Sequence, residues 1–314
     1  MTLLALDPLF QRHETGAHPE NPHRLVTVQQ HLEALGLPNR CAALPLTLAS
    51  DEQILRAHTP ELLASLNEWT ARGGGRIEAD TVMSAHSLDV ARTAAGTVAE
   101  AVSRVWRGDD TNALCLVRPP GHHARPSDPM GFCLLNSIAI AATHALSLGA
   151  EKVLVIDFDV HHGNGTQDIF YENERVAFFS SHRFPFYPGS GERAETGSGP
   201  GLGFTSNLPI SFGTPPDKAL EAIEREISEF TNRVRPELIL VSAGFDAHRL
   251  DPVGNLGWEV EHFSRLTHFI TQLAAAVCHG RVVSALEGGY HPRKLAESVE
   301  AHLQALLACD AETR

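Results

Sequence analysis

Short apolar runs that alternate with segments of helical spacing are the feature that most constrains the fold of this chain. Six runs have the length of buried strands and end in glycine, proline or charged residues: Leu3–Leu6, Ala113–Val117, Lys152–Phe158, Val176–Ser180, Leu238–Ser242 and Arg281–Leu286. Alternating strands and helices are typical of βαβ units around a parallel sheet. Because the runs are apolar almost throughout, we expect helices to cover both faces of that sheet.

Helical segments fill the intervals between most of these runs. They are predicted over Arg24–Leu35, Ser87–Trp106, Ser137–Leu148, Asp217–Val234, Glu259–Cys278 and Pro292–Ala308. Asp217 is the expected N-cap of its helix. The glycine-rich stretch from Ser181 to Gly213 is expected to be a long functional loop. Since the chain has no repeat, low-complexity tract or linker, we interpret residues 1–314 as a single domain.

Composition narrows the class of protein. The 314 residues include 25 basic and 38 acidic side chains, which gives a formal net charge of −13. This balance argues against direct nucleic-acid binding and suits a cationic substrate, although solubility alone explains it equally well. Five cysteines without a CxxC pair indicate reduced thiols. With no apolar run near the roughly 18 residues that span a membrane and no signal-peptide pattern, we expect a cytoplasmic protein without a membrane partner.

Ionisable residues gather where four of the apolar runs end. The sequences at these points are RPPGHH at 118–123, DFDVHHGNGTQ at 157–167, SAGFDAH at 242–248 and LEGGY at 286–290. Sites in open α/β sheets form beyond the carboxyl ends of the strands. We therefore expect these four segments to face one site.

The second of these segments has the pattern of a metal site. Asp157, Asp159 and His161 alternate, and the period of two of a strand directs them to the same side. Two carboxylates and an imidazole at one point favour a bound cation, and Asp246 is expected to complete the set. Asp and His ligands with one open position suit a catalytic metal. The ligand types leave zinc, iron, cobalt and manganese open.

Two adjacent histidines are the expected acid–base groups. His122 and His123 follow a rigid Pro-Pro-Gly turn at the end of a strand beside the proposed metal site. One imidazole can take a proton from an activated water while its neighbour supplies positive charge, and Asp157 and Asn164 are the available orienting partners. A purely structural pair is the alternative, but the position beside the metal motif favours catalysis.

Aromatic residues are expected in and around the same site. Tyr290 follows Gly288 and Gly289, which let the backbone approach closely, so its phenol is a candidate hydrogen-bond donor to an oxyanion. Phe132 and Tyr187 lie in expected loops and are candidates for the walls of an apolar slot. Core packing is the alternative for all three aromatic residues.

The remaining histidines carry less information, although the chain has 18 of them. His162 is interpreted as scaffold. Five others lie in helical stretches and are expected at the surface, namely His31, His58, His144, His268 and His302.

Taken together, the motifs resemble those of the histone deacetylase family, and most closely its class II-like branch of bacterial histone deacetylase-like amidohydrolases. HPENPHR at 18–24 and MGFC at 130–133 extend the similarity, which covers about residue 6 to residue 300. The resemblance implies an α/β arginase/deacetylase fold of three layers, with a mostly parallel central sheet of about eight strands.

The resemblance also implies an activity and its cofactors. The activity is that of a zinc-dependent deacetylase, which hydrolyses the amide of an N-acetylated lysine or a small acetylated amine and releases acetate. One zinc ion per chain would be held by Asp159, His161 and Asp246. A structural potassium ion would be bound by side-chain or backbone oxygens of Asp157, Asp159, His161, Ser180 and Ser181.

Roles for the other residues follow from the same resemblance. His123 would act as general base and then general acid, with His122 as its electrostatic partner and Tyr290 as oxyanion donor. Asp157 and Asn164 would orient the histidine pair. The acyl chain would occupy a tunnel formed by Gly131, Phe132, Tyr187, Val253, Gly288 and Gly289.

Three positions distinguish this chain within the family. Asn164 stands where class I members carry Asp, so we expect His123 to be less biased toward the imidazolium form. Tyr290 is retained where some weakly active class II members carry His. Val253 occupies a rim position that is acidic in polyamine-selective relatives, which weakens an acetylpolyamine reading, although acidic residues such as Asp80 can supply charge elsewhere.

Three alternative functions stay open. The first is an acetylpolyamine-selective amidohydrolase. The second is a dinuclear manganese ureohydrolase, which needs additional carboxylates that Gly163 and His248 do not supply. The third is a catalytically silent acyl-binding module, which the intact site residues disfavour. The expected partner is a small-molecule or peptide acyl-amine substrate, and the sequence does not indicate an oligomeric state.

Overall fold

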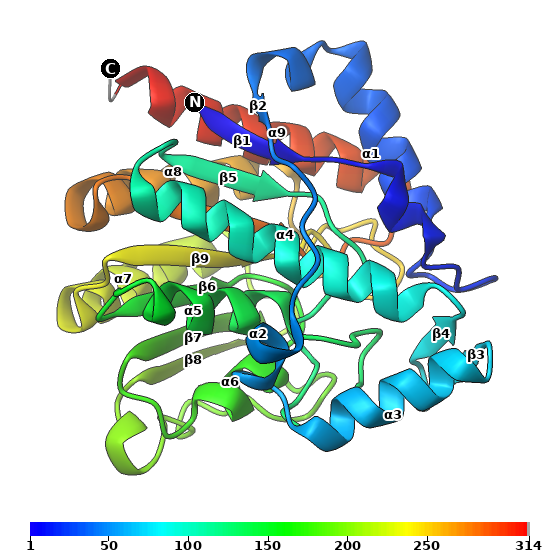
Figure 1. Cartoon of the computed structure of the whole chain (residues 1–314). Coiled ribbons are helices and arrows are strands. Elements are labelled where there is room, and N and C mark those ends of the chain that lie inside the picture. Colours follow the sequence, from blue (N-terminus) through cyan, green and yellow to red (C-terminus); the bar gives the residue numbers. More distant parts are fainter. Residues whose placement is uncertain (313–314) are drawn as a thin grey trace.

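An eight-stranded parallel sheet forms the centre of the computed structural model, which describes residues 1–312 (Figure 1). All strand pairs of this sheet run parallel, in the order β2-β1-β5-β10-β9-β6-β7-β8. The strands are β1 (Thr2–Ala5), β2 (Ala42–Ala43), β5 (Asn112–Cys115), β6 (Val153–Asp157), β7 (Val176–Arg183), β8 (Thr205–Ile210), β9 (Leu238–Ala243) and β10 (Val282–Leu286).

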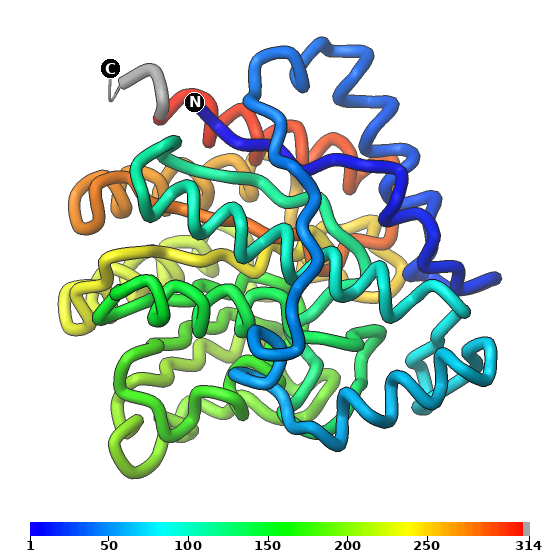
Figure 2. Tube along the Cα trace, viewed as in Figure 1, coloured from blue at the N-terminus to red at the C-terminus, as the bar shows by residue number. Residues whose placement is uncertain are grey.

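Helices cover both faces of the sheet, so the molecule has three layers (Figure 1). On one face lie α4 (Ser87–Arg107) and α5 (Ser137–Ser147). The other face carries α1 (His23–Ala34), α7 (Pro216–Val234), α8 (Val260–Cys278) and α9 (Pro292–Glu312). Figure 2 shows that segments from the two ends of the chain, β1 and α9, lie side by side. This arrangement is the three-layer α/β architecture expected from the sequence.

Shorter elements lie outside the central layers. The α-helices among them are α2 (Asp51–Leu55), α3 (Pro60–Ala71) and α6 (Asn164–Phe170). A small antiparallel hairpin joins β3 (Gly74–Arg76) to β4 (Val82–Ser84). Three 3-10 turns are η1 (Pro8–Arg12), η2 (Leu37–Arg40) and η3 (Gly199–Gly201). No helix within residues 1–312 has both the length and the apolar character that a membrane crossing requires.

The six predicted strands and six predicted helices are present within a few residues of their expected limits. The expectation of one long loop from Ser181 to Gly213 was wrong, because β7 extends to Arg183 and β8 occupies Thr205–Ile210. β8 is an edge strand with sequence TSNLPI, so its polar residues and proline hid it from a search for apolar runs. β2, the other edge strand, has only two residues.

Local details also correct two expectations. Helix α7 begins at Pro216, so Asp217 lies in its first turn and does not cap it. His58 and His302 are buried rather than exposed. The His302 ring lies between the hydroxyls of Thr267 and Ser284, at 2.7 and 2.9 Å, which satisfies both of its nitrogens.

The four strands that precede the ionisable segments are neighbours at the centre of the sheet, in the order β5-β10-β9-β6. Their parallel direction brings all four carboxyl ends to one edge. The sheet itself therefore gathers the residues of the candidate site.

Candidate active site

A compact group of buried side chains at this edge has the composition of a metal site. One ligand atom each from Asp159, His161 and Asp246 lies within 4.8 Å of the other two. Asp159 and His161 follow β6, and Asp246 follows β9. Backbone amides hold the carboxylates, since Gly288 donates to Asp159 Oδ2 at 2.8 Å and Val160 donates to Asp246 Oδ1 at 2.9 Å.

The donor set and its packing fit a divalent cation such as zinc. Within the described residues, Asp246 Oδ2 is buried without a hydrogen-bond partner and lies 3.1 Å from His161 Nδ1. A Cβ atom at Gly288 would collide with the Oδ2 atoms of both Asp159 and Asp246, so only glycine allows this close approach. Burial and the Asp159 charge raise the pKa of Asp246. A cation would compensate these two carboxylates, and the mixed Asp/His set suits zinc.

The two adjacent histidines are oriented by different partners. His122 Nδ1 lies 3.0 Å from Asp157 Oδ2, and His123 Nδ1 lies 2.8 Å from Asn164 Oδ1. All four side chains are buried, and the two imidazole centres are 4.0 Å apart. The structure thus pairs each histidine with an expected partner, His122 with a carboxylate and His123 with a neutral amide.

Because their partners differ, the two imidazole rings have different charge states. Burial lowers the pKa of His122, but the carboxylates of Asp157 and Asp159 outweigh it and raise that pKa to about 10. Burial, together with the positive charge of His122, holds the pKa of His123 well below its usual value. At neutral pH the pair therefore combines an imidazolium with a neutral imidazole that can accept a proton.

Glu287 supports the histidine pair from the end of β10, and sequence reasoning gave it no role. Its Oε2 atom accepts hydrogen bonds from the backbone N–H of Gly121 at 2.6 Å and of His122 at 3.2 Å. Ser242 donates to the other carboxylate oxygen at 3.2 Å. The only available signal was its place in the LEGGY segment, directly after a strand.

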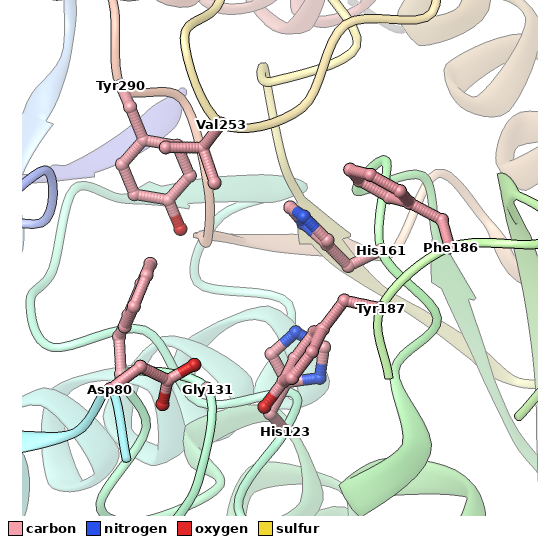
Figure 3. A pocket seen from close by; sticks show the side chains of 9 residues that line it. Asp80, His123, Gly131, His161, Phe186, Tyr187, Val253 and Tyr290 are labelled. Atoms are coloured by element: carbon pink, nitrogen blue, oxygen red, sulfur yellow. The ribbon is translucent and has the colours of Figure 1, made fainter. Parts of the chain in front are cut away.

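A narrow pocket of about 140 Å³ opens beside these groups (Figure 3). Its lining is mostly aromatic and aliphatic, with one carboxylate: Asp80, His123, Gly131, Phe132, His161, Phe186, Tyr187, Val253 and Tyr290. Four expected tunnel residues, Gly131, Phe132, Tyr187 and Val253, are among them.

The rest of the pocket lining differs from the expected tunnel. Among the residues that the structure describes, the wall does not include Gly288 or Gly289; Gly288 instead packs against the carboxylates of the metal group. Phe186, to which we gave no tunnel role, stacks on the His161 ring with centroids 5.2 Å apart. Asp80, which we expected only to supply charge away from the rim position of Val253, lines the pocket as well.

Tyr290 directs its hydroxyl into this pocket (Figure 3). Arg24 lies over the phenol ring, with its guanidinium carbon 4.8 Å from the ring centre, and Arg24 Nε donates to the carbonyl of Gly289 at 2.6 Å. Burial raises the pKa of Tyr290 well above its usual value. The phenol therefore stays protonated and can donate a hydrogen bond to a developing oxyanion.

The residues expected around potassium include two members of the metal group, Asp159 and His161. Ser180 of β7 is the sheet-register partner of Asp157 of β6, and both are buried, as is Ser181. His162, interpreted as scaffold, contacts Ser190 Oγ at 2.8 Å and Gln167 Oε1 at 3.0 Å.

Comparisons with known proteins identify the family of the chain. The histone deacetylase domain matches residues 18–306. A probable deacetylase of Archaeoglobus fulgidus is 37% identical over 284 residues, covering 90% of this chain and 79% of that protein. Histone deacetylase 15 of Arabidopsis thaliana is 37% identical over 300 residues, covering 94% of this chain and 54% of that protein.

A solved structure extends the similarity to three dimensions. The crystal structure of the HDA15 HD domain matches with a TM-score of 0.92 at 35% sequence identity, covering 99% of this chain and 93% of that one. The central parallel sheet flanked by helices is thus the arginase/deacetylase fold. With the family domain covering most of its length and the fold shared throughout, this chain belongs to the histone deacetylase family of deacetylases.

Proposed function

We propose that the chain is a zinc-dependent deacetylase that hydrolyses the amide of an N-acetylated lysine or of a small acetylated amine. One observation carries the proposal. The ligand group of Asp159, His161 and Asp246, the imidazole of His123 and the hydroxyl of Tyr290 meet at one narrow pocket. These groups meet three needs of amide hydrolysis, which are an activated water, a base and an oxyanion donor.

When bound by Asp159, His161 and Asp246, zinc supplies Lewis-acid chemistry, because it lowers the pKa of water and polarises a carbonyl. His123 is the general base. Its Nδ1–H donates to Asn164, so Nε2 is free to take a proton from the attacking water and later to give it to the leaving amine.

Two further groups stabilise charge during the reaction. His122 stays protonated beside Asp157 and offsets the negative charge that develops nearby. The Tyr290 hydroxyl donates a hydrogen bond to the oxyanion formed from the amide carbonyl. The products are acetate and the free amine.

The pocket walls favour an extended acyl-lysine side chain. Phe132, Phe186 and Tyr187 line a volume of about 140 Å³, which suits a slender alkyl chain better than a branched or ring-shaped one. The proposed partner is therefore a small-molecule or peptide acyl-amine. Cytoplasmic localisation stays a prediction.

We also propose a structural potassium ion beside the zinc ligands. The site uses side-chain or backbone oxygens of Asp157, Asp159, His161, Ser180 and Ser181. Support comes from the register of β6 and β7, which pairs the buried Asp157 with Ser180 and so gathers oxygen ligands at one point.

An acetylpolyamine is the second candidate substrate, and one observation favours it. Asp80 contributes a carboxylate to the pocket wall, where it would attract a second, cationic amine of the substrate. Val253, on the same wall, adds no charge. We rank acetyl-lysine first because most of the pocket lining is apolar, which suits a substrate whose bound side chain carries no second charged amine.

Other functions are less well supported. A dinuclear ureohydrolase needs two metals, but residues 1–312 contain one group of potential ligands, and Gly163 and His248 add none to it. A silent acyl-binding module has no need for the complete set of His122, His123 and Tyr290.

A substrate panel tests the proposal. Acetyl-lysine peptides, longer acyl-lysines and acetylated polyamines are incubated with the zinc-loaded chain, and amine release is measured, with Tyr290→Phe as the matched control. The proposal predicts release from acetyl-lysine that depends on Tyr290. Binding of these compounds without any hydrolysis would instead support the acyl-binding module.

A further inference from the structure

Asp251 is a buried carboxylate that joins two segments of the active site through their backbones. Its Oδ1 atom accepts hydrogen bonds from the N–H groups of Val253 at 2.9 Å and Gly254 at 3.0 Å. Its Oδ2 atom accepts from Tyr290 at 2.6 Å and from His291 at 3.3 Å. One side chain therefore holds both the segment that carries Val253 and the segment that carries Tyr290.

These contacts account for the burial of the Asp251 charge. Among the residues that the structure describes, no salt bridge to Asp251 is formed, so four backbone donors replace the water that the carboxylate loses on folding. Helix α9 begins at Pro292, directly after the Tyr290 segment, and the positive end of its dipole also favours a carboxylate here.

Both segments held by Asp251 face the substrate pocket. Val253 lines it, and Tyr290 directs its hydroxyl into it (Figure 3). Gly254 is tied further, since its carbonyl accepts a hydrogen bond from Arg183 at 3.2 Å. Asp251 thus links the position of the proposed oxyanion donor to the position of the pocket wall.

The Tyr290 segment needs such an anchor. Strand β10 ends at Leu286, so the sheet does not hold the residues that follow. Gly289, directly before Tyr290, has φ of +120°, a conformation that glycine adopts readily because it has no Cβ atom. The Arg24 guanidinium lies over the phenol ring and bonds the carbonyl of Gly289. Asp251 is what holds the backbone N–H of Tyr290 itself.

We propose that Asp251 is a positioning residue that fixes the Tyr290 hydroxyl relative to the pocket wall. The inference rests on the proposed role of Tyr290 as the oxyanion donor. Asp251 does not touch the substrate, and its effect on turnover passes through Tyr290.

A double-mutant cycle tests this route. Asp251→Ala is made in the wild-type chain and in the Tyr290→Phe variant, and kcat and metal content are measured for all four proteins. We expect Asp251→Ala to lower kcat by about tenfold or more when Tyr290 is present. In the Tyr290→Phe background we expect less than about a threefold further loss, because the hydroxyl that Asp251 positions is already gone.

Asp251→Asn guards against a variant that fails to fold. Its amide keeps one acceptor oxygen and can hold only one of the two segments, so we expect a kcat between those of wild type and Asp251→Ala. Asp7→Ala is the control, because Asp7 also accepts a backbone N–H, from Leu9, but lies in a turn outside the pocket. We expect it to leave kcat unchanged.

A second measurement reads the contact without turnover. The chain has three tyrosines, so labelling with ¹⁵N-tyrosine gives three backbone amide signals, and Tyr290→Phe identifies one of them. A 2.6 Å bond to a carboxylate moves an amide proton downfield. We expect Asp251→Ala to move the Tyr290 signal upfield and to leave the Tyr171 signal in place.

The outcomes separate the two proposals. Equal loss of kcat from Asp251→Ala in both backgrounds, or an unmoved Tyr290 signal, would overturn the positioning role. Failure of the proposed function looks different, because the wild-type chain would then hydrolyse no acyl-amine while the Tyr290 signal still responded to Asp251→Ala.

Discussion

The Nδ1 atom of His123 lies 2.8 Å from the side-chain oxygen of Asn164, a neutral partner, whereas the adjacent His122 is paired with the carboxylate of Asp157. The two rings are only 4.0 Å apart, so protonation of one opposes protonation of the other. The neutral partner leaves His123 as the ring that loses its proton first. This asymmetry assigns the role of base to His123 and that of positive charge to His122.

Asn164→Asp tests the asymmetry. A carboxylate beside Nδ1 favours the imidazolium form, so the pKa of His123 should rise from its depressed wild-type value. A base must be unprotonated, and the acidic limb of the kcat/KM profile should therefore move to higher pH by about one unit. The profile is measured alongside Asn232→Asp, an exposed control. An unchanged acidic limb in Asn164→Asp would refute the orienting role of Asn164.

Tyr290→Phe tests the oxyanion donor. Removing one such donor typically lowers kcat by about 10²–10³-fold, and we expect a loss of this size with metal content unchanged. Steady-state kinetics and metal analysis are compared with Tyr171→Phe, which lies outside the pocket lining and should keep wild-type activity. Full activity in Tyr290→Phe would show that another group holds the oxyanion.

Glu20→Gln tests a buried ionic cluster behind the site. Glu20 accepts hydrogen bonds from Arg118, one at 2.7 Å, and from Arg24 at 3.0 Å. Burial by itself would raise the pKa of Glu20, but the charge of Arg118 contributes to lowering it well below the usual value. Removing the charge leaves two buried guanidinium groups without compensation, so we expect a loss of about 3 kcal/mol in the free energy of unfolding at pH 7.

The same variant has a predicted pH dependence. Because folding lowers the pKa of Glu20, its contribution is present above the unfolded pKa, near 4.5, and is lost as pH falls through the folded value. Urea unfolding should show the difference from wild type shrinking below about pH 4. Glu68→Gln, at an exposed helix pair with Arg72, should change stability little. A Glu20→Gln difference that stays constant with pH would contradict the assignment.

Asp80→Asn distinguishes the two candidate substrates. If the second amine of an acetylpolyamine binds near the Asp80 carboxylate, the variant should raise KM for that substrate several-fold and leave a neutral acetyl-lysine derivative less affected. Kinetics on both substrates provide the comparison. An equal change for both would indicate that Asp80 does not select for charge.

Sequence reasoning predicted the central fold and the ligand group because the relevant signals are local. Apolar runs marked the buried strands, and the ionisable segments directly followed four of them, which the sheet places side by side. β8 was missed because an edge strand needs no continuous apolar run. His58 was misplaced because it lies in the buried connection between α2 and α3 and not in a helix, whereas His302 lies on a buried side of α9.

The supporting carboxylates were harder to foresee. Glu287 accepts from the N–H of Gly121, 166 residues away, and Asp251 accepts from Tyr290, 39 residues away, as well as from its near neighbour Val253. Nothing local in the sequence marks the distant partners. Phe186 and Tyr187 are neighbours, and the sequence alone did not indicate that both would line the pocket. Such contacts depend on how loops pack, which the structure supplies.

The most direct test of the central claim is metal content measured together with deacetylation. The purified chain, His161→Ala and the exposed control His268→Ala are analysed by mass spectrometry for bound metal and assayed on an acetyl-lysine peptide, before and after chelation. We predict one zinc per chain, loss of metal and activity in His161→Ala, and restoration of chelated wild type by zinc. Full activity in the metal-free chain, or two metals per chain, would contradict the account.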